Sequence, residues 1–211
     1  GIFGAGFISV FGNGPCGNIN HIDVERPEDS TRQGVITEKI GLSLATAIRN
    51  AIPEARLSRP KLQIDSRVLY LPLQDISDRE IQWAKTGREP LYPERTFMEN
   101  IRRWKILDIE RMRQREAIPP SVSGEPWTLP VEIQVYSLDD KTAIVMFPGE
   151  VFVEHGLELK RRSPFSNTML IELANAWIKY IPDRKAYSQG DYEALNSRLV
   201  PGSGERMVDE A

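Results

Sequence analysis

A set of short polar side chains follows a glycine-rich turn near the start of the chain. The turn spans residues 12–17 (GNGPCG), and Asn18, Asn20, His21 and Asp23 come directly after it. Glycines permit positive φ and let the backbone come close to a ligand. Amide, imidazole and carboxylate groups can donate, accept or transfer protons. A strand that ends in such a turn, followed by polar side chains, is typical of a ligand-binding or catalytic loop.

Other interpretations of this stretch stay open. Its three glycines have the G-x-G-x-x-G spacing of a dinucleotide fingerprint, but that fingerprint must open a helix, and Pro15 and the residues after it make a poor first turn. The stretch can also be a tight turn whose Asn and Asp side chains cap their own backbone. Cys16 would need a basic partner to act as a nucleophile, and His21 is the nearest one.

A second group of candidate residues lies in the last third of the chain. Glu150 follows a strand-like run in the order Phe-Pro-Gly-Glu and is predicted at the start of a helix over 151–161. The helix dipole alone would favour a carboxylate there. His155 is predicted to be a surface or half-buried residue of this helix. Tyr180 ends the run NAWIKY, with Tyr187 and Tyr192 downstream.

Three of these stretches resemble motifs of the neutral/alkaline non-lysosomal ceramidase family. Residues 17–21 (GNINH) resemble its nucleophile loop, residues 147–150 contain its Pro-Gly-Glu, and residues 175–181 are similar to its Asn-x-Tyr-x-x-Tyr-(Ile/Val). The three occur in the family's order. The departures are Asn20 in place of the Ser nucleophile, His21 in place of Pro, and Trp177 in place of the first Tyr.

The resemblance implies a zinc-dependent amide hydrolase acting on a small-molecule or lipid-like amide, as in sphingolipid metabolism, in a secreted or periplasmic protein. It implies Glu150 and Tyr180 as zinc ligands. The catalytic loop would comprise Gly17, Asn18, Asn20 and His21. A neutral amide is no nucleophile, so either zinc-bound water attacks or Asn20 and backbone N–H groups hold the oxyanion.

Two oxygen ligands are too few for a zinc site, which needs three or four protein ligands. His21, a segment preceding this chain or a second chain would have to complete it. Because the chain starts without Met on a predicted core strand, we expect it to be the C-terminal part of a larger ceramidase-like catalytic domain. A non-catalytic ceramidase-like domain that binds a ligand or a partner is the alternative.

The composition narrows the class of protein. The 211 residues are 40% hydrophobic and 27% charged, with a net charge of −3, which are ordinary values for a globular protein and predict no nucleic-acid partner. A single cysteine excludes an internal disulfide and a Cys–Cys zinc site. No run of about 18 apolar residues is present, so no transmembrane segment is expected.

The elements that must position the candidate residues are those of one α/β domain over residues 1–211, with a mixed β-sheet flanked by helices and one antiparallel hairpin. We expect the loop 14–23, Glu150 and Tyr180 to converge on one pocket. Strands are predicted at 7–11, 62–73 with a break near 65–66, 130–138, 142–147 and 167–173. Helices are predicted at 37–52, 77–85, 94–116 and 151–161, and the end, 200–211, is expected to be extended.

Helices 37–52 and 94–116 are expected to cover the sheet. Thr37 is the predicted cap of the first. Each helix has apolar residues at helical spacing. These are Ile40, Leu44, Ala47 and Ile48 in the first, and Phe97, Ile101, Trp104 and Met112 in the second.

Overall fold

The computed structural model describes residues 6, 8, 10–21, 25, 33–55, 59–86, 94–123 and 126–211. It divides into two compact units, a larger one of residues 1–18 and 62–211 and a smaller one of residues 19–61. Within the described residues, no helix combines the length and the apolar character that a membrane crossing requires.

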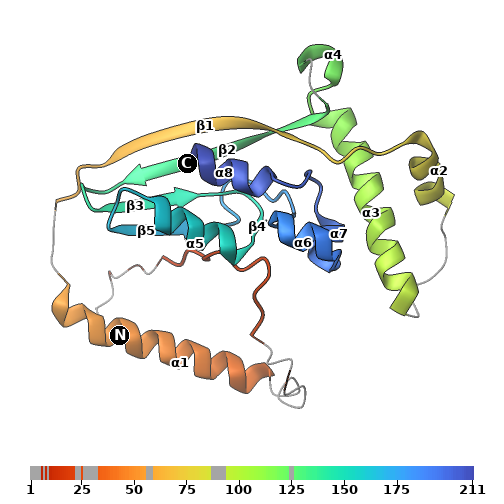
Figure 1. Ribbon diagram of the computed structural model, residues 1–211. Helices are drawn as coiled ribbons and strands as arrows, with labels where there is room; N and C mark the ends of the chain where they lie inside the picture. Colours follow the sequence, from red (N-terminus) through yellow and green to blue (C-terminus); the bar gives the residue numbers. More distant parts are fainter. Residues whose placement is uncertain are drawn as a thin grey trace. The chain divides into compact units, whose positions relative to one another are not determined.

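A four-stranded mixed sheet forms the centre of the larger unit (Figure 1). Its strands are β1 (Gln63–Pro72), β2 (Thr128–Ser137), β3 (Thr142–Met146) and β5 (Asn167–Ile171), in the order β1-β2-β3-β5. The pairs β1–β2 and β2–β3 are antiparallel, and β3–β5 is parallel. The predicted α/β class and the β2–β3 hairpin are therefore confirmed.

Strand β1 runs without a break. Asp65 pairs with Val135 and Ser66 with Gln134, so the predicted break at 65–66 is wrong. Polar residues do not interrupt this strand because its first half is exposed on both faces, and only Leu69 and Leu71 in its second half are buried. Pro72 ends the strand, where its missing N–H disturbs no ladder.

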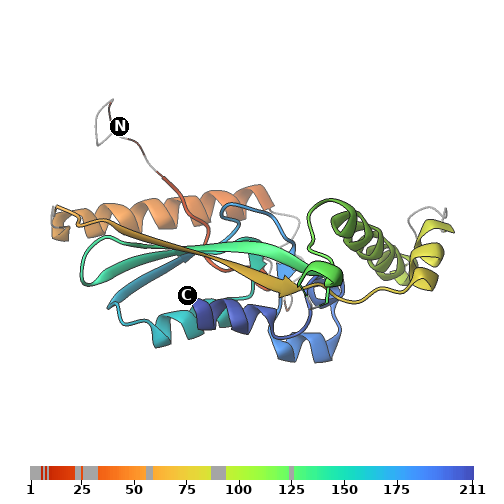
Figure 2. The same cartoon turned by 90° about the horizontal axis from the view of Figure 1, so that it is seen from above.

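Helices α5 (Val153–Arg162) and α8 (Ser203–Glu210) lie on one face of the sheet (Figure 2). Leu159, Met207 and Val208 bring their side chains into the same core as Leu71 and Val145. The expectation of an extended end over 200–211 is therefore wrong. Its apolar pair Met207–Val208 makes one face of a short amphipathic helix, and burial of that face stabilises it.

The contact between α5 and α8 depends on a glycine. His155 of α5 is only 3% exposed, so its prediction as a surface or half-buried residue is wrong. A Cβ atom at Gly204 would lie 2.2 Å from Nε2 of His155, which is shorter than any real contact. The imidazole thus packs directly on the backbone at the start of α8.

Helices α2 (Asp78–Thr86) and α3 (Glu94–Arg115) follow β1 and confirm the helices predicted at 77–85 and 94–116. They form a pair beyond the end of the sheet at which β1 ends (Figure 1). Only part of the predicted inward face of α3 is correct. Ile101 and Met112 are buried, whereas Phe97 and Trp104 are 46% and 54% exposed. The second half of α3 enters the core instead, through Ile106 and Ile109.

The remaining elements of the larger unit are short. They are α4 (Pro120–Ser123), β4 (Glu150–Val151), β6 (Tyr180–Ile181), α6 (Arg184–Gln189) and α7 (Tyr192–Asn196). Strands β4 and β6 form a separate two-stranded parallel sheet.

The predicted strand over 7–11 is wrong for the residues that the structure describes. Ile8, Val10 and Phe11 lie outside any strand and are 79–89% exposed, while Phe7 and Ser9 lie outside the described residues. The segment is hydrogen-bonded to the sheet end at Asn13, whose carbonyl oxygen accepts a hydrogen bond from the N–H of Glu172 at 2.9 Å.

The smaller unit contains helix α1 (Gln33–Ala51) and the 3₁₀ helix η2 (Ile52–Glu54). Helix α1 begins four residues before Thr37, which was the predicted cap. The predicted buried face is also wrong, because Ile40, Leu44 and Ile48 are 45–58% exposed, and Ala47 is exposed as well. Among the described residues of this unit, no second element covers that apolar face.

Candidate functional site

Glu150 and Tyr180 are direct partners across the β4–β6 sheet. The register joins Glu150 to Tyr180 and Val151 to Ile181. Glu150 therefore lies in a strand, and its predicted position at the start of the helix is wrong, because α5 begins only at Val153. Two oxygen-bearing side chains that are 30 residues apart in the chain thus become neighbours.

The carboxylate of Glu150 contacts two aromatic side chains, those of Trp177 and Tyr180. Nε1 of Trp177 donates a hydrogen bond to Oε1 of Glu150 at 2.9 Å. Burial, followed by the hydrogen bond to Glu150 and its charge, raises the pKa of Tyr180, so the phenol stays protonated at neutral pH. The Tyr180 ring lies edge-on to Tyr192 at 5.7 Å, and Tyr192 stacks on Phe97 at 6.0 Å.

The backbone around Glu150 is strained. Leu173, Asn175 and Lys179 have φ values of 56°, 67° and 70°, in the left-handed region that non-glycine residues seldom adopt. Hydrogen bonds hold this loop to the Pro-Gly-Glu turn: Leu173 N–H donates to the Gly149 carbonyl and Glu150 N–H to the Lys179 carbonyl. Each such conformation costs about 1–3 kcal/mol, and residues of this kind concentrate at functional sites.

A buried carboxylate, Glu172, joins the glycine-rich loop to β4. It is 3% exposed. Its Oε1 accepts from Nδ2 of Asn13 at 2.9 Å and from Sγ of Cys16 at 2.8 Å. Its Oε2 accepts from the backbone N–H groups of Cys16 at 3.2 Å and Val151 at 2.7 Å. Glu172 is therefore the anchor of the loop.

Sequence reasoning missed Glu172. The signal that points to it is its position directly after the strand-forming run Met169-Leu-Ile, where a carboxylate is costly unless it has partners. The same contacts bear on Cys16. Burial and the hydrogen bond to Glu172 raise the pKa of the Cys16 thiol, which disfavours the thiolate that a nucleophile requires.

Gly17 lies directly on the backbone of β4. It is buried, and its N–H donates to the carbonyl oxygen of Val151 at 2.8 Å. A Cβ atom at position 17 would be 2.5 Å from the carbonyl oxygen of Glu150. Only glycine permits this approach without a shift of the loop or of β4.

Asn18 caps helix α5 from another part of the chain. The residue at the cap position, Phe152, supplies no side-chain hydrogen bond. Instead Oδ1 of Asn18 accepts from the Val153 N–H at 2.9 Å, and its Nδ2 donates to Oε2 of Glu154 at 2.8 Å. This geometry gives Asn18 a positioning role, and its role in catalysis stays a prediction.

Replacing Asn18 by alanine is expected to lower the free energy of unfolding by about 1 kcal/mol, because the first turn of α5 loses its cap. Urea denaturation followed by circular dichroism measures the change. Glu154→Gln is the matched control, since it keeps an acceptor for the Asn18 amide and leaves the cap intact. Equal stability losses in the two variants would contradict the capping role.

Asn20 and His21 belong to the smaller unit, whereas the contacts described above lie within the larger one. Their assignment to the catalytic loop stays a prediction, and Asp23 lies outside the described residues. The structure therefore brings together Gly17, Asn18, Glu150 and Tyr180 of the predicted site residues.

The donor set at Glu150 and Tyr180 fits zinc in kind, because a carboxylate and a phenol supply adjacent oxygen ligands. It fits only in part. Among the described residues, no group of three or more His, Cys, Asp or Glu side chains could hold a metal ion. A zinc ion bound at this pair would need further ligands from outside it.

No family model matches this chain, and no curated protein does. Among solved structures, it is similar to the neutral ceramidase from Pseudomonas aeruginosa, with 15% identity and a TM-score of 0.39 over 70% of this chain and 27% of that one. It is also similar to a ceramidase complexed with C2, with 13% identity and a TM-score of 0.38 over 70% and 29% of the two chains. The chain thus spans less than a third of the length of these solved chains.

Proposed function

We propose that this chain is part of a ceramidase-like, zinc-dependent amide hydrolase in which Glu150 and Tyr180 bind the metal. One observation carries the proposal. The three segments that resemble ceramidase motifs are in direct contact, since Gly17 lies on the backbone of Glu150 and Val151, and Glu150 pairs with Tyr180. The strained backbone between Glu172 and Tyr180 adds support, because every non-glycine residue with positive φ in the described part of the chain lies in the loop that holds Glu150.

The residues around the pair have distinct tasks in this proposal. The chemistry that zinc supplies in such sites is polarisation of a carbonyl and activation of a nucleophile. The indole N–H of Trp177 orients the Glu150 carboxylate, as outer partners of metal ligands commonly do. The Trp177 ring is 57% exposed and can contact the hydrocarbon part of a lipid-like amide. Asn20 would hold the oxyanion of the substrate and His21 would orient the amide.

Protonation of Tyr180 makes metal affinity depend on pH. The phenol must lose its proton to bind zinc, and burial and the neighbouring Glu150 raise its pKa. Zinc affinity should therefore rise with pH, and binding should release a proton.

The second candidate function is a non-catalytic domain that binds an amide ligand or a partner. The observation that favours it is Asn20 at the position where the ceramidase-like loop has its Ser nucleophile. Such a domain would retain the contacts among Gly17, Glu150 and Tyr180 without turning over a substrate.

Zinc titration of the 211-residue chain by calorimetry tests the proposal. We expect weak binding that Glu150→Ala and Tyr180→Phe each reduce by about tenfold or more, with a tyrosinate absorbance change that Tyr180→Phe abolishes. Glu158→Ala is the matched control, since this exposed glutamate of α5 forms a surface ion pair with Arg161. Zinc binding that is unaffected by Glu150→Ala would overturn the metal site. Zinc binding without hydrolysis of N-acyl amides would favour the non-catalytic domain.

A further inference from the structure

A pocket of about 370 Å³ is formed by residues other than those around Glu150. Apolar side chains from α7 and the segment after it form much of its lining: Ala194, Leu195, Val200 and Pro201. Gln74, Lys105 and Tyr187 supply polar groups. Lys105 is the one cation among the lining residues.

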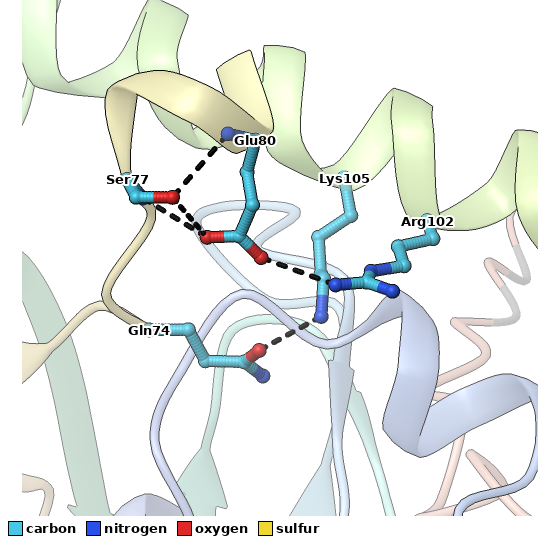
Figure 3. A network of polar contacts seen from close by, with 5 residues as sticks. All are labelled: Gln74, Ser77, Glu80, Arg102 and Lys105. Carbon is cyan, nitrogen blue, oxygen red and sulfur yellow. Dashed lines mark hydrogen bonds and ion pairs between the residues drawn. The ribbon is translucent and has the colours of Figure 1, made fainter. Parts of the chain in front are cut away.

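The amine of Lys105 is held by a neutral group. Its Nζ donates a hydrogen bond to Oε1 of Gln74 at 2.8 Å (Figure 3). Gln74 is itself fixed, because its Nε2 donates to the carbonyl oxygens of Ser197 and Leu199 at 3.0 Å each. Its backbone N–H also donates to the carbonyl oxygen of Arg198. The amine is thus positioned by a rigid amide.

Among the described residues, Lys105 forms no ion pair, because the nearby charges are already paired. Glu80 of α2 binds Arg102 at 3.1 Å and accepts hydrogen bonds from Ser77 (Figure 3). Asp75, at the pocket, pairs with Arg113.

The remaining titratable group in the lining is Tyr187 of α6. Its hydroxyl donates to the Leu199 carbonyl, and burial raises its pKa to about 12, so it stays neutral. Lys105 therefore faces the charge of Arg102, and the opposing charge of Glu80 is paired with Arg102. Burial, and then that charge, lowers the pKa of Lys105 to about 8.

We propose that Lys105 is the reactive amine of a carbonyl-binding pocket and forms an imine with a small, neutral aliphatic aldehyde or ketone. The apolar lining suits an aliphatic chain, and among the lining residues an anionic carbonyl compound would find no cation besides the reacting amine. The Nζ lone pair attacks the carbonyl carbon and forms the C–N bond. Both N–H protons of the neutral amine leave with the carbonyl oxygen as water, so the C=N bond forms without an oxidant.

The protonation state of Lys105 makes this reaction possible near neutral pH. With a pKa of about 8, roughly a quarter of the amine is unprotonated at pH 7.5, against about one part in a thousand for an ordinary lysine. The neutral fraction is thus roughly 200-fold larger. The lower basicity of the amine offsets part of this gain, so we expect a rate advantage of about tenfold or more.

Reductive labelling of the folded chain tests the proposal. The chain is incubated with propanal and cyanoborohydride at pH 7.5, and peptide mass spectrometry follows each lysine. We expect Lys105 to be labelled at least about tenfold faster than Lys85, which pairs with Glu110 at 2.7 Å and is the matched control. The rate at Lys105 should reach half its maximum near pH 8 and should saturate with propanal, whereas labelling at Lys85 should rise linearly.

A variant separates the electrostatic contribution from simple accessibility. Arg102→Gln removes an exposed cation and releases Glu80, so the amine of Lys105 becomes more basic and its labelling at pH 7.5 should slow several-fold. Labelling of Lys105 at the same rate as Lys85 would contradict the proposal that Lys105 is a reactive amine. A labelling rate at Lys105 that rises linearly with the propanal concentration would contradict the proposal that the pocket binds the carbonyl compound.

Discussion

Replacing Glu172 by alanine is expected to lower the free energy of unfolding of the larger unit by about 3–5 kcal/mol. The substitution removes four hydrogen bonds to one buried carboxylate, and hydrogen bonds to charged groups contribute about 1.5–3 kcal/mol each before water replaces some of them. The buried N–H of Val151 would lose its partner altogether. Urea denaturation followed by circular dichroism measures the loss, and hydrogen exchange should show residues 13–17 released from β4.

Two variants make the result specific to the anchor. Glu172→Gln keeps the shape of the side chain and one acceptor oxygen but turns an N–H group toward donors. Its free energy of unfolding should therefore lie between those of the wild type and Glu172→Ala. Glu99→Ala removes an acid that pairs with Arg103 on the surface of α3 and should change stability by less than about 1 kcal/mol. If Glu172→Ala unfolds at the same urea concentration as Glu99→Ala, Glu172 does not anchor the loop.

Replacing Gly17 by alanine is expected to cost about 2–3 kcal/mol and to move the glycine-rich loop away from Glu150. The added methyl group would lie 2.5 Å from a carbonyl oxygen that belongs to a paired strand, so the loop must give way. Its movement breaks the hydrogen bond between Gly17 N–H and the Val151 carbonyl. Urea denaturation measures the loss of unfolding free energy.

Gly14→Ala is the matched control for this substitution. It lies in the same loop, and a Cβ atom there would meet nothing within 4 Å. The two variants therefore differ in packing but share the change in backbone freedom. Equal stabilities for Gly14→Ala and Gly17→Ala would contradict the close approach of the loop to β4.

Periodicity in the sequence was sufficient to predict the elements that depend on contacts between neighbouring parts of the chain. The β2–β3 hairpin has alternating apolar runs on both sides of Asp139-Asp140-Lys141, and α2 and α3 have clear helical patterns. It was insufficient where burial depends on a partner. Ile8, Val10 and Phe11 have the composition of a buried strand, yet among the described residues no strand pairs with them. Helix α8 depends on the surface that β1 and α5 present to Met207 and Val208.

The candidate site could be predicted only in part, for a similar reason. Resemblance singled out Glu150 and Tyr180, but nothing in a spacing of 30 residues specifies that they pair in register. Glu172 has no motif, and its importance arises from four donors that come from distant parts of the chain. Lys105 lies in a helix with several other basic residues, and only the fold directs it to Gln74.

The order of the strands has a consequence for how the chain folds. β2 and β3 are joined by a short turn and can pair within microseconds, but even the residues of β1 and β2 that are nearest in the chain, Pro72 and Thr128, are 56 positions apart. Closing so long a loop lowers the folding rate, and the local pairing of α2 with α3 shortens the effective loop only in part. β1 should therefore join a preformed hairpin late. Until it does, β2 presents an unpaired edge ten residues long, and this intermediate is the species in which the chain is most prone to associate with another copy.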